Sequence, residues 1–485
     1  MTSARAGTAT ACSPGVVVMR LALLLGLLFS TIACSIATLD TMRNQPLPPQ
    51  GEPRHTRASE TITASDLTDD LFIGIALSGG GSRAANFSAA VLLELDRLGI
   101  LGKATALSAV SGSSLPTAYF GLYGRDQSLW NRDDVRQQMK KDFEIRWFGR
   151  WFLPQNIPAY WFTNFNRSDL MKEVFDSNLF KHKTIGDMGS GLPRILINST
   201  TLTEGKRFVF SEERFKVLNS RIDTFPIANA VMASSAVPAA FHDMTLRDHS
   251  ATKAETYEHV VDGGSTDNLG ITTLLSMVKS LYSGKDHPKG CFLFVVDSYP
   301  YPRYPPHKHK ADTRAGIDFF LDTNVAAASA DALLMVRRIN LLDQLNVDAR
   351  GTNIDPLQFN TGDDRIRPDT APHQDLRVEC AVWHLSLQRL LSADFASEAV
   401  KRDDDLRDDV KYVAAVVNSI PTRFKLMGKD PRSDTELKSE TLQNYLFRAA
   451  DYLIHLDNDR TGTPFLRRIC DWFAERGVRD IKCEK

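Results

Sequence analysis

The sequence lacks the signatures of several large protein classes. Its 58 basic residues are balanced by 59 acidic ones, a formal net charge of -1, so the totals give no sign of the basic clusters that a nucleic-acid partner requires. Neither a Gly-x-x-x-x-Gly-Lys-Ser/Thr phosphate loop nor a Gly-x-Gly-x-x-Gly dinucleotide fingerprint occurs. With 43% hydrophobic and 24% charged residues, the chain is expected to be globular and to have no nucleic-acid partner.

A long apolar run is also missing. The run near the amino terminus, Leu21 to Phe29, is shorter than the roughly 20 apolar residues of a membrane span. It follows Arg20 and leads through small residues to Cys34, the shape of an export signal. "TIAC" resembles the bacterial lipobox, in which Cys34 would be lipidated, although Thr31 stands where Leu is usual. Ordinary cleavage nearby and an uncleaved anchor are the alternatives, and each predicts a membrane-anchored or exported protein of a bacterial cell envelope.

Composition divides the rest of the chain. Residues 1–34 form the signal or lipoprotein-type segment, and residues 35–70, rich in Pro, Ser, Thr and charge, are expected to be a flexible linker. Residues 71–430 are expected to be the main folded domain and 431–485 a helical extension. Cys470 and Cys483 could close a small loop, whereas Cys291 in "CFLFVVD" is interpreted as a buried apolar residue.

Strand-like and helix-like patterns alternate from Leu71 onward. "LFIGIAL" has the continuous apolar character of a buried strand, and Phe87, Val91, Leu95 and Leu98 then recur at helical spacing. "ATALSAV", "PRILINSTTL", "RFVFS", "HVVDGG" and "CFLFVVDS" are further strand candidates. This rhythm predicts an α/β fold with helices on both faces of the sheet.

Three glycines, Gly79, Gly80 and Gly81, connect the first strand to the first helix. The first N–H groups of a helix have no internal partner, and glycines let an anion approach them closely. The loop therefore predicts a site for an oxyanion or a lipid phosphate, with a structural glycine turn as the alternative. Arg83 adds a positive charge that could bind a lipid phosphate or support the loop.

Two further turns carry groups suited to acyl transfer. Ser111 follows an apolar strand and precedes a helix, the context of a nucleophile elbow, although Ser113 and Ser114 are alternatives and any of them could be a helix cap. None of the 11 histidines lies in an evident catalytic motif. Asp262, at the end of "HVVDGG", is the better candidate for a base, with a strand-ending turn as its alternative.

In this order the motifs resemble the patatin-like phospholipases, which hydrolyse acyl esters with a Ser–Asp dyad, and "ASSAVPAAF", "DGGSTDNLG" and "NSIPTRFKL" are similar to bacterial members. The resemblance implies a three-layer α/β/α fold with a mostly parallel sheet, followed by carboxyl-terminal helices. It implies that Ser111 attacks the ester, that Asp262 is its base, that Gly79, Gly80 and Gly81 form the oxyanion hole, and that no cofactor or metal is needed. The outer elbow positions, Ala109 and Ser113, depart from the usual glycines.

The predicted function is hydrolysis of carboxylic esters of phospholipids or related lipids, of the phospholipase A or lysophospholipase type. An acyltransferase using the same dyad and a non-catalytic lipid-binding or scaffold protein are the alternatives. A membrane surface is an expected partner, because four of the six tryptophans lie between residues 130 and 165, three of them beside Arg146 and Arg150. Packing in the core is the alternative for these aromatic residues.

Overall fold

The computed structural model describes most of the chain from Arg43 onward. The described residues are 43–48, 55–191, 193–238, 240–251, 255–283, 287–299, 334–343, 345, 357–360, 377–392, 395, 401, 403–420, 422–425, 441–458 and 462–483. Cys34 and the predicted signal lie outside them. Within these ranges no helix has the length and apolar character needed to cross a membrane.

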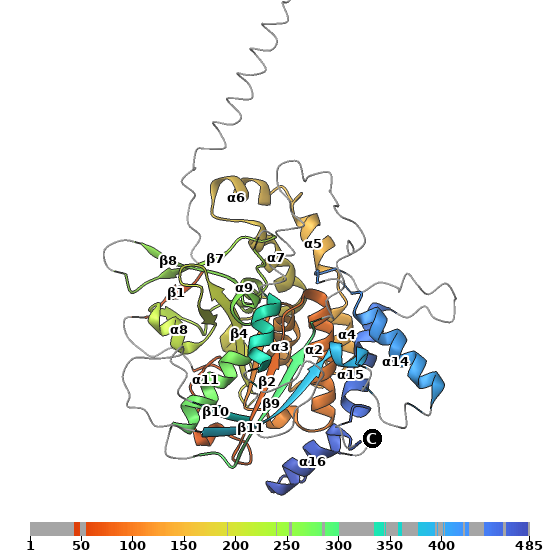
Figure 1. Cartoon of the computed structure of the whole chain (residues 1–485). Coiled ribbons are helices and arrows are strands. Elements are labelled where there is room, and N and C mark those ends of the chain that lie inside the picture. The colour runs from red at the N-terminus through yellow and green to blue at the C-terminus, as the bar shows by residue number, and fades with distance from the viewer. Residues whose placement is uncertain are drawn as a thin grey trace, which may run out of the picture. The chain divides into compact units, whose positions relative to one another are not determined.

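The described chain contains two compact units. The segment Leu153–Phe165, which carries helix α6 (Asn156–Phe162), is assigned to a small unit. All the other described elements belong to the large unit, and they are shown with α6 in Figure 1.

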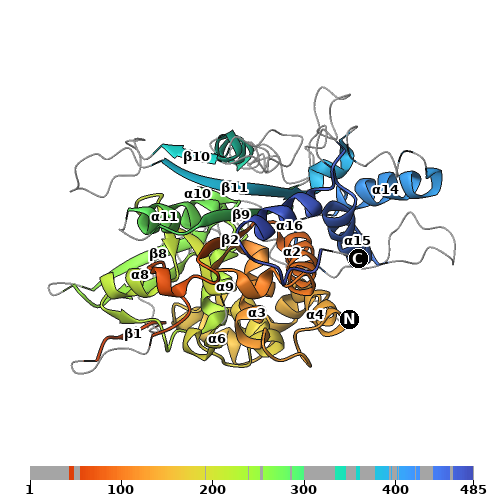
Figure 2. The same ribbon diagram turned by 90° about the horizontal axis from the view of Figure 1, so that it is seen from below.

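One mixed sheet forms the centre of the large unit. Five neighbouring strands, in the order β11-β9-β2-β3-β4, are parallel, and antiparallel strands follow at both edges, with β10 beside β11 in Figure 2. The strands are β2 (Leu71–Leu77), β3 (Ala106–Val110), β4 (Arg194–Thr201), β5 (Arg207–Val209), β7 (Met244–Asp248), β8 (Thr256–Asp262), β9 (Gly290–Asp297), β10 (Leu357–Asn360) and β11 (Arg377–Ser386). The predicted strands are present, and β7, β10 and β11 are additional to them.

Alternate side chains of the parallel strands point to opposite faces of the sheet, and helices cover both. Ile73 and Ile75 of β2 pack in one hydrophobic cluster with helix α2, whereas Phe72 and Ala76 pack in another with helix α11. The helices are α2 (Gly81–Arg97), α3 (Ser114–Tyr123), α4 (Arg132–Met139), α5 (Phe143–Arg150), α7 (Arg167–Phe175), α8 (Glu212–Val217), α9 (Ile227–Ser234), α10 (Gly264–Asp267), α11 (Ile271–Tyr282), α14 (Asp404–Val417), α15 (Leu442–His455) and α16 (Phe465–Glu475). The predicted three-layer α/β/α arrangement is confirmed.

The segment before β2 is part of the large unit and pairs with its other elements, so the linker prediction is wrong for residues 43–48 and 55–70. Strand β1 (Gln45–Pro46) pairs with β6 (Ser220–Arg221), and Arg43 forms an ion pair with Asp169 at 2.9 Å. Ala58 is fully buried. The segment has a fixed place because it pairs with other parts of the chain.

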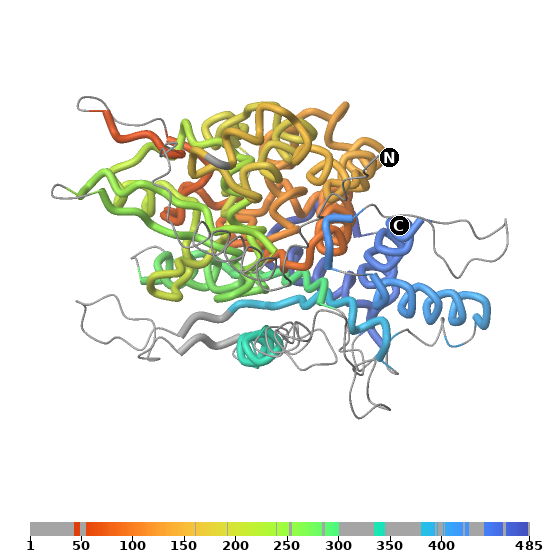
Figure 3. Tube along the Cα trace, turned by 90° about the horizontal axis from the view of Figure 1, so that it is seen from above, coloured from red at the N-terminus to blue at the C-terminus, as the bar shows by residue number. Residues whose placement is uncertain are grey.

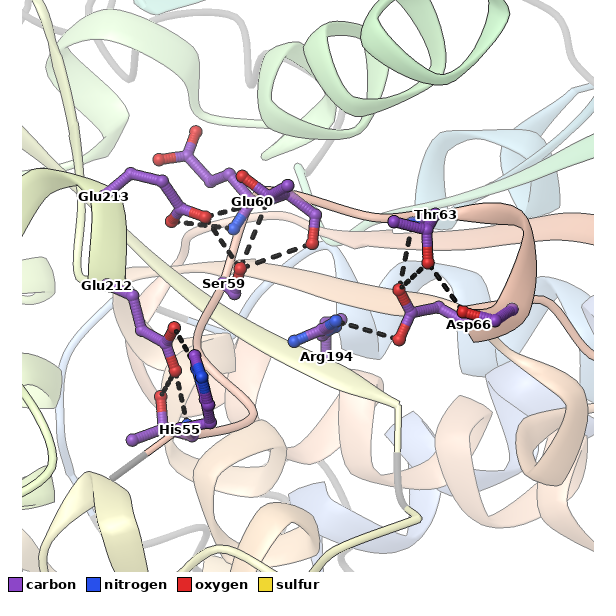
Figure 4. A network of polar contacts seen from close by, with 11 residues as sticks. His55, Ser59, Glu60, Thr63, Asp66, Arg194, Glu212 and Glu213 are labelled. Carbon is purple, nitrogen blue, oxygen red and sulfur yellow. Dashed lines mark hydrogen bonds and ion pairs between the residues drawn. The ribbon is translucent and has the colours of Figure 1, made fainter. Parts of the chain in front are cut away.

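Carboxylates of helix α8 hold residues 55–61 through backbone N–H groups and side chains (Figure 4). Glu213 accepts the N–H groups of Glu60 at 3.0 Å and of Thr61 at 2.9 Å, together with the Ser59 hydroxyl at 2.7 Å. Burial raises the pKa of Glu213, but these hydrogen bonds outweigh it and lower the pKa to about 2. The polar composition of this segment predicted a flexible linker because the segment is held in place mainly by hydrogen bonds and not by apolar packing.

The carboxyl-terminal helices share the core of the large unit. Helix α15 packs against α2, and the two lie side by side in Figures 1 and 3. Gln443 donates to Asn86 at 2.7 Å, and His455 lies 2.6 Å from Glu94. The described chain after residue 441 thus carries helices α15 and α16, and α15 packs directly on α2.

Two disulfides are present. Cys470 bonds to Cys483, the pairing considered from the sequence, whereas Cys291 bonds to Cys380. The parallel register places Ala381 opposite Phe292, which brings Cys380 next to Cys291 on the same face. Interpreting Cys291 only as an apolar residue was wrong, since the neighbouring strand that supplies its partner was not predicted.

We expect loss of the shorter disulfide to lower the free energy of unfolding. Its cysteines are 13 residues apart, and closing a loop of this size in the unfolded chain is worth about 3 kcal/mol. Urea unfolding of a Cys470→Ser/Cys483→Ser variant measures the loss. Non-reduced peptide mapping should recover both linked pairs, and free thiols at Cys291 and Cys380 would contradict the second.

Candidate active site

The register of the sheet brings the predicted catalytic turns together. Val110, the last residue of β3, lies opposite Asn198 of β4, and the next residue of β4, Ser199, lies opposite Asp262 of β8. Because β8 runs antiparallel to β4, its carboxyl end stops beside the carboxyl end of β3. Asp262 therefore lies next to the turn that begins at Ser111.

Ser111 has the backbone conformation of a nucleophile elbow. Its φ is 52°, in the left-handed region that non-glycine residues seldom occupy. The conformation is held by its own N–H, which donates to Ser234 Oγ at 2.8 Å, while Ser234 Oγ donates to the carbonyl oxygen of Asn198 at 2.6 Å. The turn aims the Ser111 side chain away from the strand.

The other two serines of the elbow have different environments. Ser113 Oγ donates to the carbonyl of Ser78 and lies 2.7 Å from Ser88 Oγ, whereas Ser114 Oγ lies 3.1 Å from Ser234 Oγ. Both residues are fully buried. Their hydroxyls are used to join structural elements, so the geometry favours Ser111 among the three serines.

Asp262 is a buried carboxylate with one free oxygen. Its Oδ1 accepts the Gly264 N–H at 2.7 Å, and its Oδ2 is buried without a formed hydrogen bond in the described part of the chain. Burial raises the pKa of Asp262 to about 6, while the Gly264 N–H and the Ser111 side chain act in the opposite direction. The Ser111 side chain is thus close enough to the buried carboxylate to influence its ionisation.

The three glycines of the first turn do not have equivalent amides. The Gly79 N–H donates to the carbonyl of Asn268 at 2.9 Å, and the Ser82 N–H donates to that of Arg423 at 2.9 Å. For Gly80 and Gly81 the described residues supply no acceptor. The Gly79 N–H is therefore occupied, and the amides of Gly80 and Gly81 are the remaining candidates for the predicted oxyanion hole.

Close backbone contact brings this loop next to Ser111. A Cβ atom at Gly112 would lie 2.0 Å from the carbonyl oxygen of Gly81, and one at Gly79 would lie 3.2 Å from Ser111 Cβ. Gly80 and Gly81 have φ values of 142° and 57°, which glycine adopts without a steric penalty. Glycine is needed at these positions so that helix α2 can begin beside the elbow.

Arg83 supports the loop and is not placed to bind a substrate phosphate. The residue is buried; its Nε donates to the carbonyl of Ser298 at 2.8 Å and its Nη1 to that of Ile420 at 2.6 Å. Of the two roles considered for Arg83, the structure favours support of the glycine loop, and the substrate-binding assignment is corrected.

Sequence motifs gave no indication of Ser298, the residue that joins the loop to the sheet. Its N–H donates to Ser78 Oγ at 2.8 Å, its Oγ donates to the Gly79 carbonyl at 2.8 Å, and its carbonyl accepts Arg83. Ser298 directly follows β9, so its position depends on strand order and not on a local motif.

Behind Ser298 lies a buried ionic cluster that the sequence analysis also missed. Asp297 Oδ2 accepts Arg338 Nε at 2.8 Å and lies 2.9 Å from His384 Nε2. Burial would raise the pKa of Asp297, but the charge of Arg338 and the hydrogen bond to His384 hold it well below its usual value. These residues come from separate parts of the sequence, and each has a common structural explanation when it is considered alone.

Within the part of the chain that the structure describes, no group of three or more His, Cys, Asp or Glu side chains could hold a metal ion. The chemistry available at the site comes from a hydroxyl, a buried carboxylate and two backbone amides. This combination suits attack on a carbonyl carbon with stabilisation of the resulting oxyanion.

Residues 75–275 match the family model of the patatin-like phospholipases. The matched range begins within β2, includes both predicted catalytic turns and ends within α11. The large unit has the patatin fold, a mostly parallel central sheet flanked by helices, as the sequence predicts. No curated protein matches the chain.

Solved structures give weaker likenesses. Human GIVD cytosolic phospholipase A2 is 13% identical with a TM-score of 0.42; the match covers 80% of this chain and 61% of that one, so the chain spans about three fifths of the human protein. VipD from Legionella pneumophila is 12% identical with a TM-score of 0.26, over 92% of this chain and 83% of that one. Likenesses this weak carry no functional argument.

The contact between loop and elbow predicts that Gly112→Ala destabilises the protein. The added methyl group would meet backbone atoms of Gly81, which cannot move aside as a flexible side chain can, and such overpacking costs typically about 1–3 kcal/mol. Gly102→Ala is the matched control, since no atom lies within 4 Å of its Cβ position. Urea unfolding compares the two variants, and equal midpoints would show that the close contact is not formed.

Proposed function

We propose that the protein is a lipid ester hydrolase in which Ser111 is the nucleophile and Asp262 its base. The observation that supports the proposal is that Ser111, at positive φ, lies close to a buried carboxylate and next to a glycine loop in which the described residues supply no acceptor for the amides of Gly80 and Gly81. The match of residues 75–275 to the patatin-like phospholipases supports the substrate class.

Acylation begins with attack of Ser111 Oγ on the ester carbonyl carbon. As the C–O bond forms, the hydroxyl proton passes to Asp262 Oδ2, the carboxylate oxygen without a hydrogen bond. The carbonyl oxygen becomes an oxyanion that accepts hydrogen bonds from the amides of Gly80 and Gly81, a contribution of roughly 3 kcal/mol for each donor. The bond to the alcohol then breaks, and Asp262 returns its proton to the leaving alkoxide.

Deacylation repeats the same steps with water. Asp262 takes a proton from the water molecule, whose oxygen attacks the acyl carbon of the Ser111 ester. The second oxyanion occupies the same two amides, and its collapse returns a proton to Ser111 and releases a fatty acid.

Phospholipids or lysophospholipids are the proposed substrates, and a membrane surface is the proposed place of action. If another alcohol replaced water in deacylation, the same residues would perform acyl transfer. A non-catalytic lipid-binding protein is disfavoured, because binding alone does not require a strained serine beside a buried carboxylate. Export to a bacterial cell envelope, with Cys34 as a lipid anchor, remains part of the proposal.

Labelling by a fluorophosphonate tests the nucleophile. Wild type and Ser113→Ala should label and release fatty acid from mixed phospholipids, whereas Ser111→Ala should do neither. Asp262→Asn should lower hydrolysis by at least about a hundredfold, since general base catalysis contributes that much. Unfolding curves should show all variants folded. Labelling retained in folded Ser111→Ala would contradict the assignment.

The pKa of Asp262 predicts how hydrolysis depends on pH. The base acts when ionised, so kcat/KM should fall as pH decreases through about 6 and should reach a plateau about one pH unit higher. Because the folded pKa lies above the unfolded one, ionisation of Asp262 opposes folding, and Asp262→Asn should not be less stable than wild type at pH 8. A rate that stays constant from pH 8 to pH 5, with the protein folded throughout, would exclude Asp262 as the base.

A further inference from the structure

We propose that helix α5 and the turn after it form a docking surface for an anionic lipid membrane, positioned to deliver lipid to the glycine loop. This docking surface consists of Ile145, Phe148 and Phe152 with the adjacent cations Lys140, Arg146 and Lys181. The inference rests on the proposed function for its purpose, but the binding that it predicts can be measured without catalysis.

The apolar side chains of the docking surface are largely exposed to solvent and do not pack in the protein core. Ile145, Phe148 and Phe152 are 70%, 60% and 69% exposed. Their spacing of three and four residues places them along one helical stripe, and the rings of Phe148 and Phe152 pack edge to face with centroids 5.4 Å apart. The stripe presents large apolar groups where solvent would favour polar ones.

Other residues of α5 fix the helix to the large unit. Phe143 is buried and packs against Phe175 with ring centroids 5.4 Å apart. Trp147 packs against Phe241 at 5.6 Å, and its Nε1 donates to the carbonyl of Arg167 at 3.0 Å. The exposed stripe is therefore the outer face of an anchored helix. Trp130, which the sequence grouped with these aromatic residues, is buried in the core.

Positive charge accompanies the apolar stripe. Lys140 lies three residues before α5, Arg146 lies within it, and both are exposed, as is Lys181. Lys141 Nζ donates to the carbonyl of Asn178 at 2.9 Å, which brings the segment that carries Lys181 next to the start of α5. Burial lowers the pKa of Lys141, and the charges of Arg146 and Lys181 lower it further. Such an arrangement of apolar side chains with Lys and Arg is typical of helices that lie in the interface of an anionic bilayer.

The carboxylates around α5 are largely occupied. Asp142 caps the helix by accepting the Ile145 N–H at 2.8 Å, and Glu173 pairs with Arg150 at 2.8 Å. Asp176 pairs with His182. Glu144 is half-buried, with its Oε2 enclosed. Exposed positive charge therefore predominates beside the stripe.

A short strip of backbone connects α5 to the glycine loop. The Glu144 N–H donates to the carbonyl of Phe424 at 3.0 Å, and the carbonyl of the preceding residue, Arg423, accepts the Ser82 N–H. A Cβ atom at Gly81 would lie 2.8 Å from the carbonyl carbon of Thr422. Residues 422–424 thus contact the membrane-facing helix on one side and the proposed oxyanion loop on the other.

A lipid surface fits this arrangement better than a protein partner. A stable protein interface buries about 800 Å² on each partner and needs matching shape, whereas a bilayer accepts three apolar side chains and a few cations without shape complementarity. The next segment of the chain, which carries α6, also exposes Ile157, Tyr160 and Phe162. Exposed apolar helices therefore follow one another in the chain.

Vesicle binding by the full chain tests the docking surface. Flotation with phosphatidylcholine–phosphatidylglycerol vesicles should show a partition coefficient at least roughly tenfold lower for Phe148→Asp/Phe152→Asp than for wild type, since burial of the two partly exposed rings together is worth more than one decade. Val217→Asp is the matched control, because Val217 is an equally exposed apolar residue on α8, at 65%. Higher salt, or pure phosphatidylcholine, should weaken wild-type binding.

A site-specific probe separates docking at α5 from attachment through the amino terminus. An environment-sensitive dye on Phe152→Cys should shift to the blue with vesicles, and the same dye on Val217→Cys should not; labelled wild type supplies the background from Cys12 and Cys34. No shift at residue 152, or binding unchanged in the double Asp variant, would overturn the proposal. Loss of self-association by that variant, without loss of vesicle binding, would assign the face to a second copy instead.

Activity distinguishes failure of this inference from failure of the proposed function. The double Asp variant should hydrolyse a soluble short-chain ester at the wild-type rate and should lose at least tenfold on vesicle substrate, in step with binding. If wild type hydrolyses neither substrate, the proposed function fails while the binding result still stands. An equal loss on both substrates would show damage to the site and would contradict a docking role.

Discussion

The backbone contact between Gly81 and Gly112 is the constraint on which the rest of the site depends. It lets the first turn of α2 lie against the elbow of β3, next to Ser111, with two glycine amides for which the described residues supply no acceptor. A side chain at Gly112 would separate the two turns, and one at Gly81 would meet the backbone of Thr422. Ser234 holds the elbow by accepting the Ser111 N–H. Ser298, which follows β9, holds the glycine loop through hydrogen bonds to the Gly79 carbonyl and from Arg83.

The site combines two buried carboxylates with opposite electrostatic environments. Asp262 has one backbone donor and the loosely placed Ser111, so burial dominates and its pKa rises. Asp297 has a buried Arg338 and His384, so its pKa falls despite equal burial. A carboxylate that accepts a proton, as proposed for Asp262, must change its charge during the reaction. A carboxylate that only holds other residues in place, such as Asp297, must keep its charge. The difference between the two environments matches this division of roles.

Local signals in the sequence were sufficient for the parts of the site that are continuous in the chain. The apolar run of β2, the glycines and the helical spacing of Phe87 and Val91 predicted a strand, a turn and a helix that the structure contains. Contacts between distant segments left no such signal. Cys291 forms a disulfide with a cysteine that only the order of the strands brings close to it. Arg83 donates hydrogen bonds to the carbonyls of Ser298 and Ile420. The segment 55–61 is bound by carboxylates of α8, although its composition indicated a linker.

The strip at residues 422–424 has a consequence for what counts as the smallest working unit of this protein. The family-matched range ends at residue 275, yet Ser82 and Arg83, inside that range, bond to carbonyls of Arg423 and Ile420, and helix α15 covers the back of α2. A fragment limited to the matched range would contain every residue of the proposed chemistry and would leave the glycine loop without its outer wall. The region that contains the proposed chemistry is therefore not a self-contained folding unit. Its glycine loop is completed by residues that lie some 150 positions after the end of the matched range.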